Sequence, residues 1–258
     1  MNQEVKTAIR ARGVFKSFRD KGVLKGLDLD ILEAETMVII GRSGCGKSVF
    51  LKHIMGLIKP DAGEIWVDGQ EITAIKGREL NDARRKFGMV FQGAALFDSM
   101  TVGQNVGFYL NEYTDLSETE VRGIVEDKLR LVGLENIQDL KPAELSGGMK
   151  KRVSLARAIA HDPKVMLYDE PTTGLDPIMA DVINELIIKL DEQLNVTSIA
   201  VTHDMVSAYK IADRIAMMYG GKIVAVGTPA EIRESQDPVI QQFINGRAEG
   251  PIDVIGGA

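Results

Sequence analysis

Residues 41–48 constrain this chain most, because they follow the pattern glycine, four residues, glycine, lysine, serine. The run reads Gly41, Arg42, Ser43, Gly44, Cys45, Gly46, Lys47 and Ser48, and Val49 comes next. Apolar residues 37–40 predict a buried strand before it, and residues 49–57 predict a helix after it. Glycines let backbone N–H groups turn toward phosphate oxygens, and the helix N-terminus adds the positive end of a dipole. The sequence therefore predicts a phosphate-binding loop, in which Lys47 faces the β- and γ-phosphates and Ser48 ligates Mg²⁺.

The composition is that of a globular protein that can bury its own core. The chain has 258 residues, of which 45% are hydrophobic and 26% charged. No apolar run approaches the roughly 18 to 20 residues that span a bilayer, and the first six residues lack the apolar centre of a signal peptide. The net charge of −6 argues against a general nucleic-acid binder. We therefore expect a cytoplasmic protein without a nucleic-acid partner.

Cys45 is the single cysteine of the chain. One cysteine excludes an internal disulfide and is typical of a reducing compartment. Because Cys45 lies near the N-terminus of a predicted helix, we expect its thiolate form to be favoured.

Alternating strands and helices predict an α/β fold with a mainly parallel, doubly wound sheet around the phosphate-binding loop. The predicted strands are residues 8–18, 24–32, 37–40, 65–67, 89–92, 164–168, 197–201 and 214–218. The strands before the loop predict a small antiparallel β layer. Residues 179–194 predict a helix, and residues 237–245 a short one.

Residues 93–160 have helical spacing throughout. One amphipathic helix there has its apolar face at Val121, Ile124, Val125, Leu129 and Val132, and Gly133 can end it. We therefore predict a single domain with three parts. Residues 1–92 and 161–245 form a nucleotide-binding core, residues 93–160 an inserted helical subdomain, and residues 246–258 a C-terminal tail.

An apolar strand at residues 165–168 runs into two carboxylates, Asp169 and Glu170. In P-loop ATPases a strand-end aspartate holds Mg²⁺ through water, and a neighbouring carboxylate polarises the attacking water. An acidic turn after a strand is common in inert proteins, so the phosphate-binding loop is what favours these two roles here.

Residues 145–149 resemble the signature loop of ABC-type ATPases. They read Leu145, Ser146, Gly147, Gly148 and Met149. The resemblance covers nearly the whole chain, because the other motifs follow in the family's order. These are the phosphate-binding loop, Gln92, the signature loop, the acidic strand, the dimer-facing loop with Asp176, and His203. It implies an Mg²⁺-dependent ATP hydrolase built on a P-loop NTPase core.

The resemblance also implies individual roles. Gln92 would contact Mg²⁺ or the water and respond to the transport partner, and His203 would contact the γ-phosphate. Phe18 would stack on adenine, although Phe15 is a nearby alternative. Taken alone, Gln92 is equally a surface amide, His203 a structural histidine and Phe18 a core residue.

Ser146 and the two glycines after it can open a helix near Met149 and so provide a second anion site. The resemblance implies a head-to-tail dimer in which each ATP lies between one subunit's phosphate-binding loop and the other's signature loop. The family commonly has glutamine where this chain has Met149, and Gly-Glu where it has Ala34 and Glu35. Ser146 and both glycines remain, so we expect hydrolysis to survive.

Three stretches resemble a narrower group, the ATPase subunits of bacterial Mla (MCE-type) phospholipid transporters. They are the signature loop ending in Met149, residues 91–102, and residues 242–246 with Gly250 and Pro251. The group powers phospholipid transport between the inner and outer membranes, which maintains outer-membrane lipid asymmetry. This implies a peripheral protein on the cytoplasmic face of the inner membrane, bound to a permease and, through it, to a periplasmic MCE-type subunit. Whether a small STAS-type subunit joins is left open.

Other ABC functions compete with this interpretation. The chain could serve an ABC transporter with a different substrate. ABC ATPases of DNA repair carry long heptad coiled coils, which are missing here, and those of translation carry two cassettes, whereas this chain has one phosphate-binding loop. A P-loop kinase would not need the signature loop.

The tail contains Ile252, Val254 and Ile255 between glycines. It is either frayed chain or a strap whose apolar side chains lie on another surface. The Mla-type resemblance implies that it reaches over the opposite ATPase subunit, so truncation after Gly250 should weaken dimer assembly.

Overall fold

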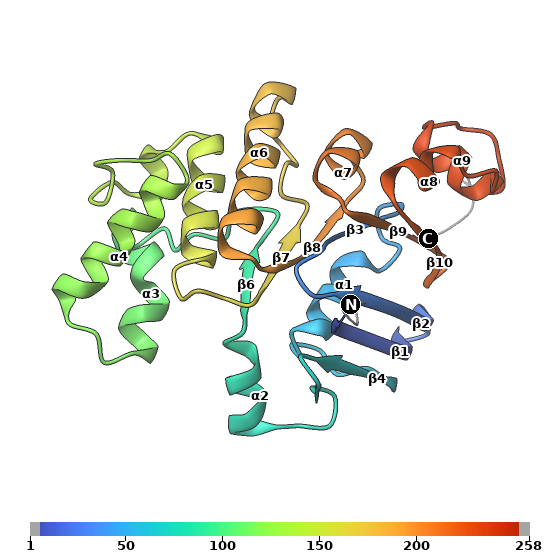
Figure 1. The fold of residues 1–258 in the computed structure, drawn as a ribbon, viewed down its shortest axis with the longest axis horizontal. Helices are drawn as coiled ribbons and strands as arrows, with labels where there is room; N and C mark the ends of the chain where they lie inside the picture. Colours follow the sequence, from blue (N-terminus) through green and yellow to red (C-terminus); the bar gives the residue numbers. More distant parts are fainter. Residues whose placement is uncertain (1–5, 253–258) are drawn as a thin grey trace, which may run out of the picture. The chain divides into compact units, whose positions relative to one another are not determined.

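The computed structural model of the protein describes residues 6–252, which form two units (Figure 1). The first unit comprises the chain up to Lys76 and from Val201 onward, and the second comprises Gly77–Ala200. The chain therefore leaves the first unit once and returns to it once, which makes the second unit an insertion in sequence.

An antiparallel sheet in the first unit confirms the predicted β layer. Its strands are β1 (Thr7–Phe18), β2 (Lys21–Leu32), β4 (Ala62–Val67) and β5 (Gln70–Glu71), in the order β2-β1-β4-β5. Leu27, Leu29 and Ile31 are all buried. Alternate residues of β2 thus give the sheet its apolar face.

A second group of strands in the first unit leads to the phosphate-binding loop. All five residues of β3 (Thr36–Ile40) are buried, as expected for a parallel strand covered on both faces. It pairs in parallel with β9 (Arg214–Tyr219), which pairs antiparallel with β10 (Lys222–Gly227). The helices of this unit are α1 (Lys47–Ile54), α7 (Met205–Ile211), α8 (Pro229–Glu234) and α9 (Pro238–Ile244). Of these elements, the sequence patterns did not predict β10, α7 or α8.

The second unit contains the other parallel strands. β6 (Phe87–Val90) pairs in parallel with β7 (Val165–Asp169), and Val90 lies opposite Tyr168. The predicted strand at 89–92 therefore ends two residues early, and Gln92 lies beyond it. β8 (Thr197–Thr202) is wholly buried and contains the boundary between the units.

Helices make up the rest of the second unit. They are α2 (Gly77–Arg84), α3 (Val102–Tyr113), α4 (Glu118–Leu131), a 3₁₀ turn (Pro142–Glu144), α5 (Gly147–Ala158) and α6 (Pro177–Leu194). Among the described residues no helix, the 18-residue α6 included, is long and apolar enough to span a membrane.

The predicted amphipathic helix is confirmed as α4. Val121, Val125 and Leu129 are buried on its apolar face, and Gly133 follows it with φ 72°. The Ser117 side chain caps its first turn, in a reciprocal capping box with Glu120. α3, α4 and α5 pack against one another, and Figure 1 shows them side by side.

The tail is anchored on its own chain as far as Ile252. Ile252 is 4% exposed, and the equally buried Gln242 side chain accepts its N–H (2.6 Å) and donates to its carbonyl (3.1 Å). The expectation that Ile252 lies on a partner is therefore wrong, because Ile252 is buried within its own chain and Gln242 of α9 supplies its backbone hydrogen bonds. Val254 and Ile255 lie outside the described residues.

Candidate functional site

The predicted phosphate-binding loop connects β3 to α1 in the first unit. Its glycines adopt backbone angles that other residues avoid, with φ 153° at Gly41, 77° at Gly44 and 113° at Gly46. A Cβ at Gly41 would also collide with the Met218 carbonyl and come within 2.9 Å of the Cys45 sulfur. The backbone angles thus favour glycine at all three positions, and the close approach of the Met218 carbonyl requires it at Gly41.

Lys47 is a buried cation at the first position of α1. Its Nζ donates to the carbonyl oxygens of Gly41 (2.7 Å) and Arg42 (3.2 Å) at the start of the loop. The first turn of α1 carries no acidic residue, so nothing there offsets the positive end of the helix dipole. The ammonium and this helix end make the loop suited to binding anionic oxygens. Ser48, the second residue of α1, follows Lys47 directly.

The Cys45 thiol does not have the reactivity expected from sequence. Burial raises its pKa, and the opposing effect of the nearby Lys47 ammonium is smaller. The prediction of a favoured thiolate is wrong, since desolvation of the charged form outweighs the nearby cations and the backbone hydrogen bonds that favour it.

The two candidate aromatic residues lie near the end of β1, and both are exposed. Phe18 is 43% exposed and Phe15 is 47% exposed. The Phe15 ring lies against Gly26, where an added Cβ would come within 2.9 Å of it. The Phe18 ring lies 5.6 Å from the Lys16 ammonium. Phe18 stays the prediction for the stacking ring, with Phe15 as its alternative.

We expect Phe18→Ala to weaken adenine-nucleotide binding by about 1–3 kcal/mol, the usual contribution of an aromatic ring stacked on a base. Phe15→Ala is the matched control and should leave the affinity unchanged. The measurement is equilibrium titration with ATP and with inorganic triphosphate, which lacks the base. Loss of ATP affinity in Phe15→Ala alone would mean that the stacking ring has been placed wrongly.

His203 lies in the turn between β8 and α7, and its side chain is exposed. Hydrogen bonds on either side order this turn. Thr202 Oγ1 accepts the Asp204 N–H (3.0 Å), and the Asp204 carboxylate caps α7 through the N–H groups of Val206 and Ser207. The exposure of His203 argues against the alternative of a core histidine.

Asp169 and Glu170 lie at the end of β7 in the second unit, and both are buried. Glu170 has φ 52°, in the left-handed region, which costs a non-glycine residue roughly 1–2 kcal/mol. Its carboxylate accepts a hydrogen bond from Thr173 Oγ1 (3.2 Å). A buried carboxylate held in an unfavourable backbone conformation is typical of a functional site.

Gln92 and Glu170 approach a common partner that the sequence patterns did not reveal. The Lys151 ammonium donates to the Gln92 backbone carbonyl (2.5 Å) and lies 3.5 Å from the Glu170 backbone carbonyl. Burial lowers the pKa of Lys151, and the carboxylates of Glu170 and Asp169 act in the opposite direction. Lys151 shares a buried face of α5 with Gly148 and Leu155, where a sequence pattern predicts apolar residues.

The signature loop forms the start of α5. The Ser146 side chain caps the helix by accepting the Met149 N–H (3.3 Å). Its first turn contains no acidic residue, so the exposed Ser146 and Gly147 lie at an uncompensated helix N-terminus. The helix begins at Gly147 rather than near Met149, because the cap is Ser146. Leu145 before it is buried, and an added Cβ on Gly148 would collide with the Met179 side chain.

Asp176 is the N-cap of α6. Its carboxylate accepts the N–H groups of Ile178 and Met179, both at 3.1 Å. Ile178, on the first turn of this helix, is 77% exposed. The structure thus gives Asp176 a capping role next to an exposed apolar side chain.

The oxygen donors at these positions suit Mg²⁺. Within residues 6–252 no three His, Cys, Asp or Glu side chains group into a protein metal site. Mg²⁺ is usually held by one or two protein oxygens together with substrate phosphates. The hydroxyl of Ser48, the amide of Gln92 and the carboxylate of Asp169 are ligands of that kind.

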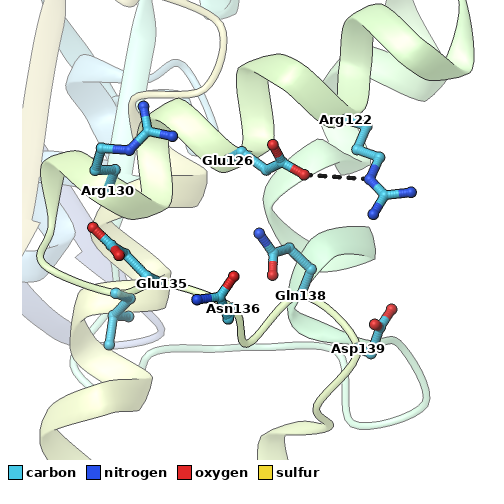
Figure 2. A pocket seen from close by; sticks show the side chains of 8 residues that line it. Arg122, Glu126, Arg130, Glu135, Asn136, Gln138 and Asp139 are labelled. Atoms are coloured by element: carbon cyan, nitrogen blue, oxygen red, sulfur yellow. Dashed lines mark hydrogen bonds and ion pairs between the residues drawn. The ribbon is translucent and has the colours of Figure 1, made fainter.

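A cavity of about 310 Å³ lies beside α4 in the second unit (Figure 2). Arg122 and Glu126 form an ion pair at its edge (3.3 Å). Its lining mixes cations, carboxylates, amides and one leucine, namely Arg122, Glu126, Arg130, Leu134, Glu135, Asn136, Gln138 and Asp139. It contains none of the predicted site residues.

Residues 24–173, more than half of the chain, match the ABC transporter family. The chain belongs to this family. The resemblance seen in the motifs is confirmed, and ATP hydrolysis is the activity that comes with the family.

Several known proteins are similar to nearly all of this chain. MlaF of Haemophilus influenzae, an intermembrane phospholipid transport system ATP-binding protein, is 43% identical over 255 residues, which cover 98% of this chain and 94% of MlaF. A probable ribonucleotide transport ATP-binding protein of Mycobacterium leprae is 42% identical over 95% of this chain and 71% of its own length. The chloroplastic TRIGALACTOSYLDIACYLGLYCEROL 3 protein of Arabidopsis thaliana is 42% identical over 95% and 75%.

A solved structure confirms the predicted fold class. The ATP-binding cassette MJ0796, in a dimeric post-hydrolysis state bound to ADP and Pi, superposes with a TM-score of 0.79. It is 33% identical, and the match covers 86% of this chain and 98% of that one. The fold is therefore that of an ABC ATPase cassette, a P-loop NTPase core of mixed sheets and helices.

Proposed function

We propose that this ABC transporter chain is the ATP-hydrolysing subunit of a system that transports phospholipid between the inner and outer membranes and maintains outer-membrane lipid asymmetry. The observation that carries the proposal is the similarity to MlaF, which is 43% identical and spans almost the full length of both chains. The Arabidopsis relative, whose name contains that of a galactolipid, supports a lipid substrate.

Ribonucleotide transport is the second candidate, because the mycobacterial relative carries that name at 42% identity. Its sequence is longer, and the match covers 71% of it, against 94% of MlaF. The names of two relatives, MlaF and the Arabidopsis protein, refer to lipids, which favours the phospholipid substrate.

The phosphate-binding loop would hold ATP, with residues 41–49 around the phosphates and Lys47 facing the β- and γ-phosphates. Phe18 would stack on the adenine, and His203 would contact the γ-phosphate. The buried Lys47 and the uncompensated N-terminus of α1 support this assignment.

The second unit would supply the groups that promote hydrolysis. Glu170 would polarise the attacking water, and its burial and left-handed backbone support that role. Mg²⁺, held by Ser48, Gln92 and Asp169, would neutralise charge on the phosphates.

A second copy of the chain would complete each ATP site. Leu145–Met149 would meet the ATP of the opposite subunit, and Asp176 would lie in the loop that faces the partner. The exposed Ser146 and Gly147 at the start of α5 and the exposed Ile178 support this arrangement. The dimeric form of the similar cassette MJ0796 supports it too.

The remaining partners would be an integral-membrane permease and, through it, a periplasmic MCE-type lipid-binding subunit, with a small STAS-type subunit as an optional member. The chain would then be a peripheral protein on the cytoplasmic face of the inner membrane. Residues 93–160 would act as its helical subdomain.

The test is affinity purification of the tagged chain from detergent-solubilised membranes, followed by mass spectrometry and reconstitution into phospholipid vesicles. We expect a permease and an MCE-type chain to co-purify, and phospholipid to leave or enter the vesicles in an ATP-dependent manner. Transport of a ribonucleotide instead would favour the second candidate. Recovery of the chain without any membrane protein would contradict both.

A further inference from the structure

Lys151 is a buried cation outside the motifs that define the site. It lies on α5, one turn after Gly147, and is 5% exposed. Burying an ammonium group is costly unless it has hydrogen-bond partners. The partners that compensate for this burial therefore indicate what the residue does.

Its partners come from two loops that are distant in sequence. The Lys151 Nζ donates to the Gln92 carbonyl at 2.5 Å, and the Glu170 carbonyl lies 3.5 Å away. Both acceptors are backbone atoms, so the ammonium fixes the course of the main chain at the two positions. The Lys151 side chain thus connects the first turns of α5 with the loops that follow β6 and β7.

The loop after Gln92 is held by α5 a second time. Arg157 donates to the carbonyl oxygens of Ala95 (2.6 Å) and Ala94 (2.8 Å). Ala94 and Ala95 have φ 61° and 50°, angles that are unfavourable for alanine. The loop keeps this conformation because cationic side chains of α5 bind its carbonyls.

Glu170 also has an unfavourable backbone, with φ 52°. The direction of the Glu170 carbonyl depends on the backbone angles of this residue. The Lys151 ammonium lies near the carbonyl oxygen only in the present conformation. A change in the loop at Gln92 would shift the ammonium and, with it, the preferred backbone of Glu170.

We propose that Lys151 is a positioning residue that holds Glu170 in its hydrolysis-competent backbone conformation and couples it to the loop at residues 92–95. The inference rests on the proposed function, in which Glu170 polarises the attacking water. It adds a physical link by which a movement of the loop at residues 92–95 reaches that carboxylate.

The test compares Lys151→Met with Lys150→Met, a matched control on the same helix, in the purified transporter complex. We expect Lys151→Met to lower kcat at least tenfold, because misplacing a catalytic group by about 1 Å can cost about 10²-fold. The KM for ATP should stay unchanged, and Lys151→Arg, which keeps the charge and the donors, should restore most of the turnover. Equal kcat values for Lys151→Met and Lys150→Met would overturn the proposal.

A double substitution separates positioning from general stability. In the Glu170→Gln background the carboxylate is already gone, so adding Lys151→Met should lower the residual turnover no further. A further tenfold loss would show that Lys151 acts by another route and would overturn the proposal. If Lys151→Met does not fold, Lys151→Gln takes its place, with the same expected loss and the same reversal by Lys151→Arg.

ATP turnover of the wild-type complex, assayed in parallel, distinguishes a failure of the proposed function from a failure of the role assigned to Lys151. Absence of ATP turnover in the wild type would contradict the proposed function. Normal wild-type turnover with a fully active Lys151→Met variant would overturn only the role of Lys151.

Discussion

Glu170→Gln should lower ATP turnover by roughly 10²-fold or more, the usual contribution of a positioned general base. Glutamine has nearly the same shape and can still accept the Thr173 hydrogen bond that the carboxylate accepts now, so the local structure should persist. ATP binding should also persist, and the dimer should remain trapped with ATP. Steady-state turnover of the assembled complex, together with size-exclusion chromatography in ATP, measures both effects.

The matched control for this variant is Glu112→Gln, an exposed glutamate on α3. It makes the same chemical change away from β7 and should leave turnover unchanged. Near-normal turnover in Glu170→Gln would show that another group polarises the water, and the assignment of Glu170 would then be abandoned.

Lys47→Ala should abolish productive ATP binding. A hydrogen bond to a charged group contributes about 1.5–3 kcal/mol, so removing an ammonium that faces two phosphates should cost about two orders of magnitude or more in affinity. The same change removes the hydrogen bonds to the Gly41 and Arg42 carbonyls, so the empty loop should also lose order. Equilibrium titration with a fluorescent ATP analogue measures the affinity.

Lys52→Ala is the control for Lys47→Ala, since it removes a lysine from the last turn of the same helix. Its ATP affinity should equal that of the wild type. If Lys47→Ala also binds ATP normally, residues 41–48 are not the phosphate-binding loop.

The phosphate-binding loop and its flanking elements could be predicted because local physics determines them. Gly41 and Gly46 adopt angles that demand glycine, and the five residues of β3 are buried on both faces, which an uninterrupted apolar run signals. The amphipathic α4 is a similar case, since its apolar spacing matches the face that it buries.

Other features depend on contacts that no local pattern encodes. β10 was missed because its residues alternate between exposed and half-buried, so it lacks the apolar run of a core strand. Lys151 was missed because it shares a buried helix face with Gly148 and Leu155, where a pattern search looks for apolar residues. The thiol of Cys45 was misjudged because its burial depends on how the whole loop folds.

The register of β6 and β7 limits where residues can be inserted into this chain without disturbing the site. Val90 lies opposite Tyr168, so Gln92 and Glu170 each stand two residues past a paired position, with their carbonyls facing one ammonium. The 74 residues from Phe91 to Lys164 separate the two strands, and in principle that excursion can gain or lose residues without moving either strand end. One residue inserted between Val90 and Gln92 would move the Gln92 carbonyl away from Lys151, because Gln92 would then lie three residues past its paired position and Glu170 only two. The helical segment between the two strands can therefore differ in length, whereas the spacing from Val90 to Gln92 and from Tyr168 to Glu170 has to stay the same for both carbonyls to meet Lys151.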